Sequence, residues 1–187
     1  ESCVSKKKEK QSSRYTEAQA HMEAAYSSLQ EKYNDIETYN AWKKDTIEVN
    51  KITLMNNGTQ SSRKSPQVLQ MIQHLSENAD HVIIQTPYVI CNGYMYDVLQ
   101  EISDHAKLQI VLNAVEKGSN PWGCTDYLNQ KKKILKTGAD VYELMNEYPV
   151  HTKAVLIDDR LSVVGSYNLD MRSTYLDTEL MLVIDSE

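Results

Sequence analysis

Apolar residues recur every three or four positions in the first part of the chain. After Thr16-x-x-Gln19, which is typical of a helix capping box, one face carries Met22, Tyr26, Leu29, Tyr33, Ile36 and Tyr39. This spacing predicts an amphipathic helix that runs to about Lys44. We expect it to pack on the rest of the protein or on a partner, with a free-standing coiled coil as the alternative. Residues 1–14 are polar and rich in Lys and Ser, which favours a mobile lead-in.

After Lys51 the pattern changes to short apolar runs that alternate with helical stretches. A strand over residues 52–55 precedes the turn signal Asn56-Asn57-Gly58. The other predicted strands are 81–89, 108–114, 141–144 and 180–184, and the predicted helices are 66–79, 94–105 and 125–137. Strands that alternate with helices of this length predict an α/β fold. Two further strands around a tight turn at 158–161 add an antiparallel element.

Polar residues with related chemistry gather in one stretch near the C-terminus. The stretch reads His151-x-Lys153-x4-Asp158-x6-Gly165-Ser166-x-Asn168. An imidazole can attack phosphorus or protonate a leaving oxygen. An ammonium can neutralise a phosphate oxygen, and Ser and Asn add hydrogen bonds without charge. The set therefore suits phosphoryl chemistry, while Asp158 is expected to stabilise a turn.

A hairpin would bring four of these side chains together. If residues 153–157 and 161–166 pair around a two-residue loop, His151 faces Asn168 and Lys153 faces Ser166. Because side chains alternate between the faces of a strand, all four would then project from one face. A longer loop would shift this register.

Charge and cysteine content narrow the classes of function. The net charge of −6 lies entirely in residues 52–187, whereas residues 1–51 hold nine basic and nine acidic residues. Duplex binders usually carry a basic footprint, so nucleic acid is not the expected partner. Cys3, Cys91 and Cys124 have no metal-ligand spacing and no pairing pattern, so we expect free thiols of a reducing compartment and no metal or other cofactor. No window reaches the roughly 18 apolar residues of a membrane span.

The C-terminal motif resembles the HKD motif of the phospholipase D superfamily. Asn168-Leu-Asp-Met-Arg-Ser173 and Thr178-Glu179-Leu180 extend the resemblance to the second catalytic half of bacterial cardiolipin synthases and their relatives. Ile84-Gln-Thr-Pro-Tyr88 and Leu112-Asn113 resemble two strands that end near the site. The resemblance covers residues 52–187 and implies a mixed β-sheet flanked by helices on both faces, with an N-terminal helical extension.

The resemblance also implies a mechanism. Two motifs meet, one His becomes a phosphohistidine, and the other acts as general acid and then as base. Lys153, Ser166 and Asn168 would hold the phosphate, and Glu179 would orient a catalytic His. The nucleophile usually lies in the first half, which would make His151 the general acid, although both roles stay open.

Two weaker matches and one decoy complete the set of candidates. Tyr88 and Asn113 are possible site-lining residues, with packing as the alternative reading. His105-Ala-Lys107 imitates the start of the motif, but Leu112 stands where Asp is required. The motif therefore occurs once, whereas the family mechanism needs two.

The missing second motif leaves two organisations open. The chain is either the second half of a two-motif enzyme, with residues 15–51 as a connector, or a single-motif protein that builds its site as a homodimer. The leading hypothesis is a bacterial phosphodiesterase or phosphatidyltransferase acting on phospholipids, cytoplasmic or membrane-associated, whose parent enzyme works at a membrane surface. The alternatives are a homodimeric nuclease and a catalytically silent half that acts as a pairing domain.

Overall fold

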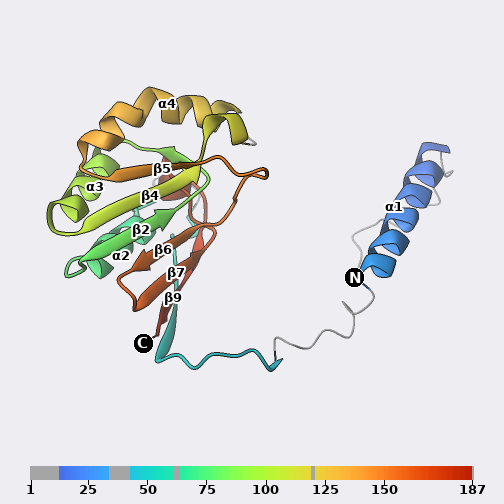
Figure 1. Ribbon diagram of the computed structural model, residues 1–187, viewed down its shortest axis with the longest axis horizontal. Helices are drawn as coiled ribbons and strands as arrows, with labels where there is room; N and C mark the ends of the chain where they lie inside the picture. Colours follow the sequence, from blue (N-terminus) through green and yellow to red (C-terminus); the bar gives the residue numbers. More distant parts are fainter. Residues whose placement is uncertain (1–12, 34–42, 61–63, 119–120, 187) are drawn as a thin grey trace. The chain divides into compact units, whose positions relative to one another are not determined.

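The computed structural model describes residues 13–33, 43–60, 64–118 and 121–186. The chain divides into two units, residues 1–47 and 48–187. Helix α1 (Ser13–Lys32) belongs to the first unit (Figure 1).

Helix α1 differs from its prediction at both ends. Thr16 lies inside the helix, so it does not act as an N-cap. The helix ends at Lys32 and Lys44 lies in a turn, so one continuous helix to Lys44 is not formed. The apolar positions within α1 stay exposed, with Met22 at 72%. Ile36 and Tyr39 lie outside the described residues.

The second unit is built on a mixed β-sheet. Among its described residues, seven strands follow the order β1-β9-β7-β6-β2-β4-β5 (Figure 1). These strands are β1 (Lys51–Asn56), β2 (His81–Gln85), β4 (Lys107–Asn113), β5 (Asp140–Leu144), β6 (Ala154–Ile157), β7 (Leu161–Gly165) and β9 (Leu180–Asp185). Strands β2, β4 and β5 are parallel, and the remaining pairs are antiparallel.

The described part of this unit also holds a small second sheet and four helices. Strand β3 (Val89–Ile90) pairs in parallel with β8 (Leu169–Asp170). The helices are α2 (Gln67–Leu75), α3 (Gly93–His105), α4 (Pro121–Lys136) and α5 (Met171–Tyr175), with a 3₁₀ turn η2 (Val115–Lys117). The expected α/β class with a mixed sheet is confirmed.

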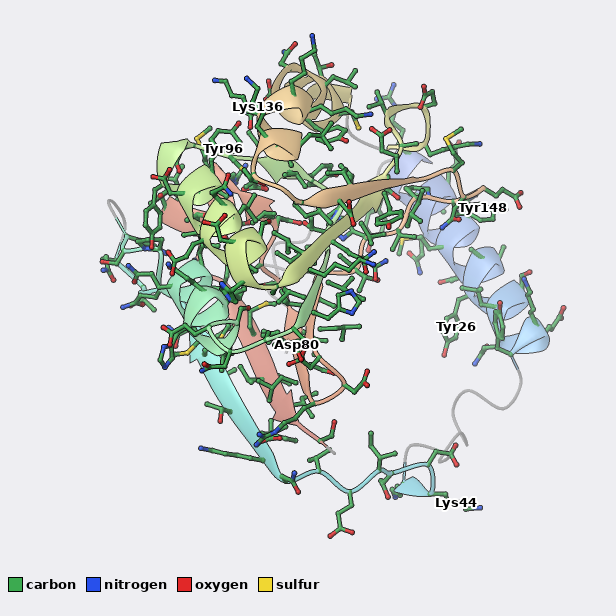
Figure 2. All side chains as sticks on the ribbon, turned by 60° about the vertical axis from the view of Figure 1, so that its left-hand side comes forward. Tyr26, Lys44, Asp80, Tyr96, Lys136 and Tyr148 are labelled. Atoms are coloured by element: carbon green, nitrogen blue, oxygen red, sulfur yellow. The ribbon has the colours of Figure 1, made fainter. Side chains whose placement is uncertain are left out.

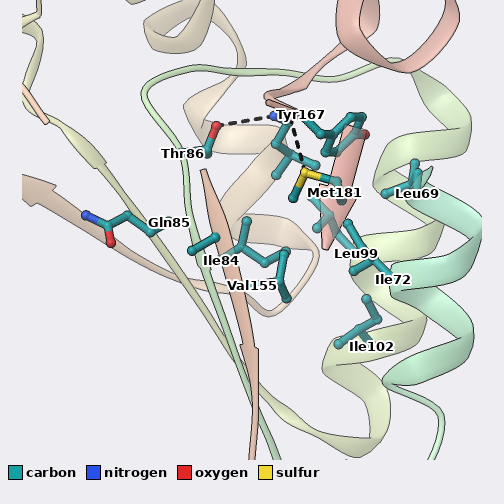
Figure 3. A pocket seen from close by; sticks show the side chains of 12 residues that line it. Leu69, Ile72, Ile84, Gln85, Thr86, Leu99, Ile102, Val155, Tyr167 and Met181 are labelled. Carbon is teal, nitrogen blue, oxygen red and sulfur yellow. Dashed lines mark hydrogen bonds between the residues drawn. The ribbon is translucent and has the colours of Figure 1, made fainter. Parts of the chain in front are cut away.

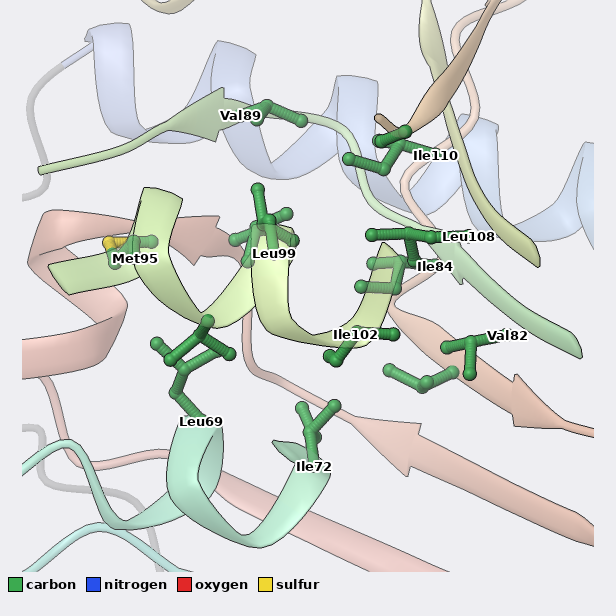
Figure 4. Packing of buried hydrophobic residues seen from close by; sticks show 14 of the residues in the cluster. Leu69, Ile72, Val82, Ile84, Val89, Met95, Leu99, Ile102, Leu108 and Ile110 are labelled. Atoms are coloured by element: carbon green, nitrogen blue, oxygen red, sulfur yellow. The ribbon is translucent and has the colours of Figure 1, made fainter. Parts of the chain in front are cut away.

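One face of the sheet forms the core. Alternate residues of the central strands point to this face, as the pleat of a strand requires. Figure 4 shows the packed side chains: Leu69 and Ile72 from α2, Leu99 and Ile102 from α3, Val82 and Ile84 from β2, and Leu108 and Ile110 from β4. All of them are at most 4% exposed, so they anchor the strands that end at the candidate site.

The opposite face of the sheet carries apolar side chains that remain accessible. Leu54 is 61% exposed, Leu156 is 41% exposed and Leu182 is 40% exposed. The register places Leu182 between Leu54 and Val164 on neighbouring strands, so the apolar positions are adjacent.

The strand predicted over 81–89 is interrupted. Strand β2 ends at Gln85, and the chain enters the small sheet only at Val89. The hydroxyl of Thr86 donates to the carbonyl of Tyr88 at 3.0 Å. It also accepts the Leu169 N–H at 3.2 Å (Figure 3). Pro87 has no N–H for a sheet ladder. These interactions turn Tyr88 out of the large sheet and towards the motif.

The hairpin register also differs from the prediction. Ile157 pairs with Leu161, so the loop has three residues, 158–160, instead of two. Asp158 adopts a positive φ of 50°, which begins this wider turn. The Gly165 N–H therefore donates to the Lys153 carbonyl, and Lys153 faces Gly165 instead of Ser166.

Two of the three cysteines lie in the described residues. Cys91 and Cys124 are free and buried, and Cys3 lies outside those residues. Burial, assisted by the negative charge of Asp170, raises the pKa of the Cys91 thiol to about 12. None of the helices in the described parts of the chain is long and apolar enough to cross a membrane.

Gly165 allows a close approach of β7 and β9. A Cβ at this position would lie 2.8 Å from the Met181 Cα and would also overlap the Leu180 carbonyl oxygen. Because the obstacle is backbone, a Gly165→Ala variant is expected to lose about 3 kcal/mol of unfolding free energy, at the upper end of overpacking costs. Urea denaturation followed by circular dichroism measures this loss.

Gly93 provides the matched control. A Cβ added there meets no atom within 4 Å, and Gly93 is the first residue of α3. A Gly93→Ala variant should therefore keep or slightly raise the stability, because Ala has the higher helix propensity. Equal stabilities for the Gly165 and Gly93 variants would show that the strands can separate at no cost.

Candidate active site

Apart from Asp158, the motif residues lie at one end of the β6–β7 hairpin. His151 lies just before β6, Ser166 just after β7, and Glu179 just before β9. In Figure 2, Asp80 lies near the start of β2 and Tyr148 in the loop that follows β5. The loop marked by Tyr148 leads into His151, so the site lies near the carboxyl ends of the parallel strands.

His151 and Lys153 are in direct contact. The Lys153 Nζ lies 2.9 Å from His151 Nδ1 and 3.4 Å from Nε2, and it donates to the His151 carbonyl at 2.8 Å. Both side chains are accessible, since His151 is exposed and Lys153 half-buried. An imidazole and an ammonium therefore face the same accessible region.

A buried carboxylate lies behind this pair. Glu179 is only 6% exposed and accepts a short hydrogen bond from the Ser166 hydroxyl. The Ser166 Oγ in turn accepts the Leu180 N–H at 3.0 Å, so the hydroxyl is fixed between β7 and β9. The negative charge of Glu179 also acts to raise the pKa of Lys153.

Asn168 lies beside the first turn of α5. Its Nδ2 donates to the Ser173 Oγ at 3.3 Å, and its Oδ1 has no protein partner among the described residues. Asp170 caps α5 by accepting the Ser173 N–H at 2.7 Å. Burial raises the pKa of Asp170, and the negative charges of Asp177 and Glu179 act in the same direction. The amide of Asn168 is thus held at the rim of an acidic region.

Asn57 ties these segments to the edge of the sheet. It is fully buried, and its side-chain Nδ2 donates to the Ser173 carbonyl at 2.6 Å. Its backbone N–H donates to the Glu179 carbonyl at 3.2 Å. The residue therefore links the end of β1 to the segments that carry Asn168 and Glu179.

The two weaker candidates lie around His151. The ring of Tyr88 meets the His151 ring edge-on, with centroids 6.3 Å apart and an interplanar angle of 77°. Asn113 is 6% exposed and binds the main chain of Val150, the residue before His151. Tyr88 is thus placed at the site, whereas Asn113 contacts the chain that leads into it.

Asp158 occupies the far end of the hairpin. Its carboxylate accepts the N–H groups of Asp80 at 3.0 Å and His81 at 2.8 Å. Its own N–H donates to the His81 carbonyl at 2.9 Å. These bonds join the hairpin turn to the start of β2, so the structure gives Asp158 a supporting position.

A cavity of about 550 Å³ opens beside the motif. Its walls include three carboxylates and one guanidinium, and Arg172 pairs with Asp177 at 3.0 Å. Apolar side chains complete part of the lining. The residues that line it are Tyr88, Ile90, Asp126, Asn168, Asp170, Met171, Arg172, Ser173, Leu176 and Asp177. Because Tyr88 also contacts His151, the cavity extends the motif site.

The charge of Lys153 gives a prediction for pH. Burial lowers the pKa of Lys153 below the usual 10.5, although the negative charges of Glu179 and Asp170 partly oppose this shift. A lower pKa means that the ammonium loses its proton at a lower pH. If this charge supports turnover, the alkaline limb of the kcat/KM profile lies below pH 10.5.

An Lys153→Arg variant tests this assignment. A guanidinium stays charged to above pH 12, so its alkaline limb should move upwards even if its maximal rate is lower. An unchanged limb would assign the titration to another group.

In the described segments, no group of three or more His, Cys, Asp or Glu side chains could hold a metal ion. Lys153 places a positive charge beside His151, with its Nζ 2.9 Å from His151 Nδ1.

Comparison with known families decides the relationship. Residues 71–187 match the family described as "Cardiolipin synthase, PLD-like domain". The chain belongs to this family. This phospholipase D-like (PLD-like) domain is 32% identical over 111 residues to cardiolipin synthase A of Klebsiella pneumoniae, covering 57% of this chain and 21% of the relative. An uncharacterized protein of Helicobacter pylori is 26% identical over 136 residues, covering 65% of this chain and 27% of the relative. The chain thus spans about a fifth to a quarter of these relatives.

Solved structures share the fold of the PLD-like domain. Nuc of Salmonella typhimurium, a phospholipase D family member, superposes with a TM-score of 0.54 at 14% identity over 73% of this chain and 84% of Nuc. Phosphatidylserine synthase of Haemophilus influenzae gives 0.55 at 19% identity over 73% of this chain and 35% of the synthase. NucT of Helicobacter pylori gives 0.51 at 19% identity over 72% of this chain and 85% of NucT. At these identities the likeness establishes the fold.

The PLD-like domain brings some predicted residues together and separates others. His151 contacts Lys153 and Tyr88, and Ser166 contacts Glu179. No hydrogen bond joins Glu179 to His151 in the described residues, so its expected role in orienting a His stays a prediction.

Sequence reasoning missed three supporting residues of the site. The sequence pattern predicts only a turn at Asn57 and places Thr86 within a strand. Asp170 could have been predicted, because Asp is one of the residues preferred at a helix N-cap, and Asp170 is the N-cap of α5.

Proposed function

We propose that this domain supplies one half of a two-motif active site that cleaves or transfers phosphodiesters of phospholipids through a phosphohistidine. The observation that carries the proposal is the contact of His151 with Lys153 beside the Ser166–Glu179 pair. A reactive imidazole, a cation and fixed hydroxyl and amide groups at one end of a hairpin suit a phosphodiester. The family match and the curated cardiolipin synthases favour a lipid substrate.

The reaction has two steps in this proposal. A ring nitrogen of one motif's His attacks phosphorus, and the bond from phosphorus to the leaving alcohol oxygen breaks as the other His protonates that oxygen. The deprotonated second His then takes a proton from water or from an acceptor alcohol. The resulting oxygen attacks phosphorus, and the phosphorus–nitrogen bond breaks. We assign His151 to the acid and base role, and Lys153 to the charge on the non-bridging oxygens.

The second His comes from outside this chain in the proposal. The sequence holds one His-x-Lys-x4-Asp motif, and the chain spans only about a fifth of the cardiolipin synthases that it matches. His151 and Lys153 are accessible at the surface, so a second half can approach them.

The cavity beside Asn168 is proposed to hold the part of the substrate beyond the phosphate. Carboxylates line it, whereas the phosphate side carries Lys153. An anionic wall disfavours a second phosphate and favours a neutral or cationic group, since like charges repel.

A nuclease assembled from two copies is the second candidate. The chain covers 84% of Nuc and 85% of NucT, so two solved chains of similar size share this fold. Net charge argues against it, because residues 52–187 carry the whole −6. A duplex would meet an unfavourable field.

Separate assays with phospholipid and with nucleic acid test the proposal directly. The protein that carries this chain is incubated with phosphatidylglycerol vesicles or with single- and double-stranded DNA, in the presence of a chelator. We expect lipid products by mass spectrometry, and an acid-labile phosphoprotein during turnover. Cleavage of DNA without conversion of lipid would transfer the assignment to the nuclease. No turnover of either would support a silent pairing domain.

A further inference from the structure

Asn113 makes a reciprocal pair of hydrogen bonds with a single distant residue. Its Nδ2 donates to the Val150 carbonyl at 2.8 Å, and its Oδ1 accepts the Val150 N–H at 2.8 Å. Both polar atoms of the Asn113 side chain thus bind main chain, and the side chain is only 6% exposed. Asn113 is the last residue of β4, whose preceding residues are fixed in the core.

The bonded residue lies directly before His151. The loop that leads to it is accessible, with Met145 at 64% and Tyr148 at 74% exposure. The two hydrogen bonds between Asn113 and Val150, which we call the clamp, thus fix the end of this exposed loop directly before His151. On the other side, Lys153 donates to the His151 carbonyl at 2.8 Å. The main chain around His151 is therefore held from both directions.

Only a carboxamide of this length satisfies both groups. Asp has a similar shape but two acceptor oxygens when ionised, so the Val150 carbonyl would face a carboxylate without a donor. Leu would leave both main-chain groups unpaired, and buried groups without partners are costly. The Val150 main chain requires one donor and one acceptor at the end of β4. This requirement explains why Asn stands at position 113, and packing alone does not.

We infer that Asn113 is a positioning residue that sets the main chain of His151 from the end of strand β4. The inference rests on the proposed function, because positioning matters only if His151 reacts. Asn113 does not contact the phosphate site itself. A shift of about 1 Å in a reacting group can lower a rate about 100-fold, so the clamp has a kinetic consequence beyond stability.

The first experiment uses the whole protein that carries this chain, with phosphatidylglycerol vesicles as the substrate. For Asn113→Asp and Asn113→Ala, kcat per folded molecule should fall about 10- to 100-fold, with KM within about threefold of the wild-type value. The matched control is Asn92→Ala. Asn92 caps α3 and also makes two side-chain hydrogen bonds, to Met95 N–H and Tyr175 Oη, so its loss should lower stability but leave kcat unchanged.

A second measurement separates this inference from the proposed function. Imidazole ¹H–¹⁵N spectra of the 187-residue chain report on His151 without turnover. In Asn113→Asp the signals of the His151 ring should shift, and the contact between the His151 and Tyr88 rings should be weakened. In Asn92→Ala the His151 signals should stay where they are in the wild type. Unchanged His151 signals, or an unchanged kcat in an active enzyme, would overturn the positioning role. An inactive wild type with shifted His151 signals would instead overturn the proposed function and keep the clamp.

Discussion

A His151→Ala variant of the protein that carries this chain is expected to lose phospholipid turnover by about 10⁴-fold or more, the order seen when a residue of a covalent catalytic unit is removed. His151 is exposed, and the two side chains found in contact with it, Lys153 and Tyr88, carry no imidazole that could replace its own. Phosphatidylglycerol conversion measured by mass spectrometry gives the rate.

His74→Ala is the control for this loss. His74 lies on the surface of α2 and pairs with Glu77 at 2.8 Å, so its removal tests for a general effect of losing an imidazole. Its rate should equal that of the wild type. Comparable turnover by the His151 variant would remove this residue from the mechanism.

Replacement of Lys153 by Met is expected to lower turnover by about 10²- to 10³-fold, which is typical for the loss of one preorganised donor. The change keeps much of the side-chain length but removes the charge. Without the ammonium, the negative charges of Glu179 and Asp170 would act on the phosphate without compensation. The unfolding free energy of the variant should change much less than its rate.

Lys107→Met is the matched control for the cation. Lys107 is exposed at the start of β4, whereas the motif lies near the ends of the parallel strands. Its variant should retain full activity. If both Met variants lost activity equally, the requirement would be for the overall charge of the domain and not for Lys153.

The sequence predicted the elements of the second unit better than their contacts. The strand expected over 108–114 forms as Lys107–Asn113, because its alternating apolar residues fit a strand. The neighbouring strands β2 and β5 pair with it on both sides. The hairpin register was missed because its loop depends on bonds from Asp158 to Asp80 and His81, far away in the sequence. The break after Gln85 likewise depends on the bond between Thr86 and Leu169.

The candidate site shows the same division. Spacing alone identified His151, Lys153 and the other motif residues, since their types and intervals are a local signal. The hydrogen-bond partner of Ser166 is set by the pairing of β7 with β9. No local pattern predicts that Glu179 accepts a hydrogen bond from the Ser166 hydroxyl. The first helix forms over Ser13–Lys32 but not as far as Lys44, because periodicity does not show where a helix ends.

The buried Asn57 shows that the family match and the folded sheet begin at different residues. Sequence likeness to the family begins at residue 71, yet β1 and Asn57 precede it and pair with β9 and the main chains of Ser173 and Glu179. The stretch that matches the family is thus shorter than the stretch that pairs in the fold. A truncation at residue 71 would expose the edge of β9, whereas a dissection that starts before Lys51 keeps the edge strand and the site together.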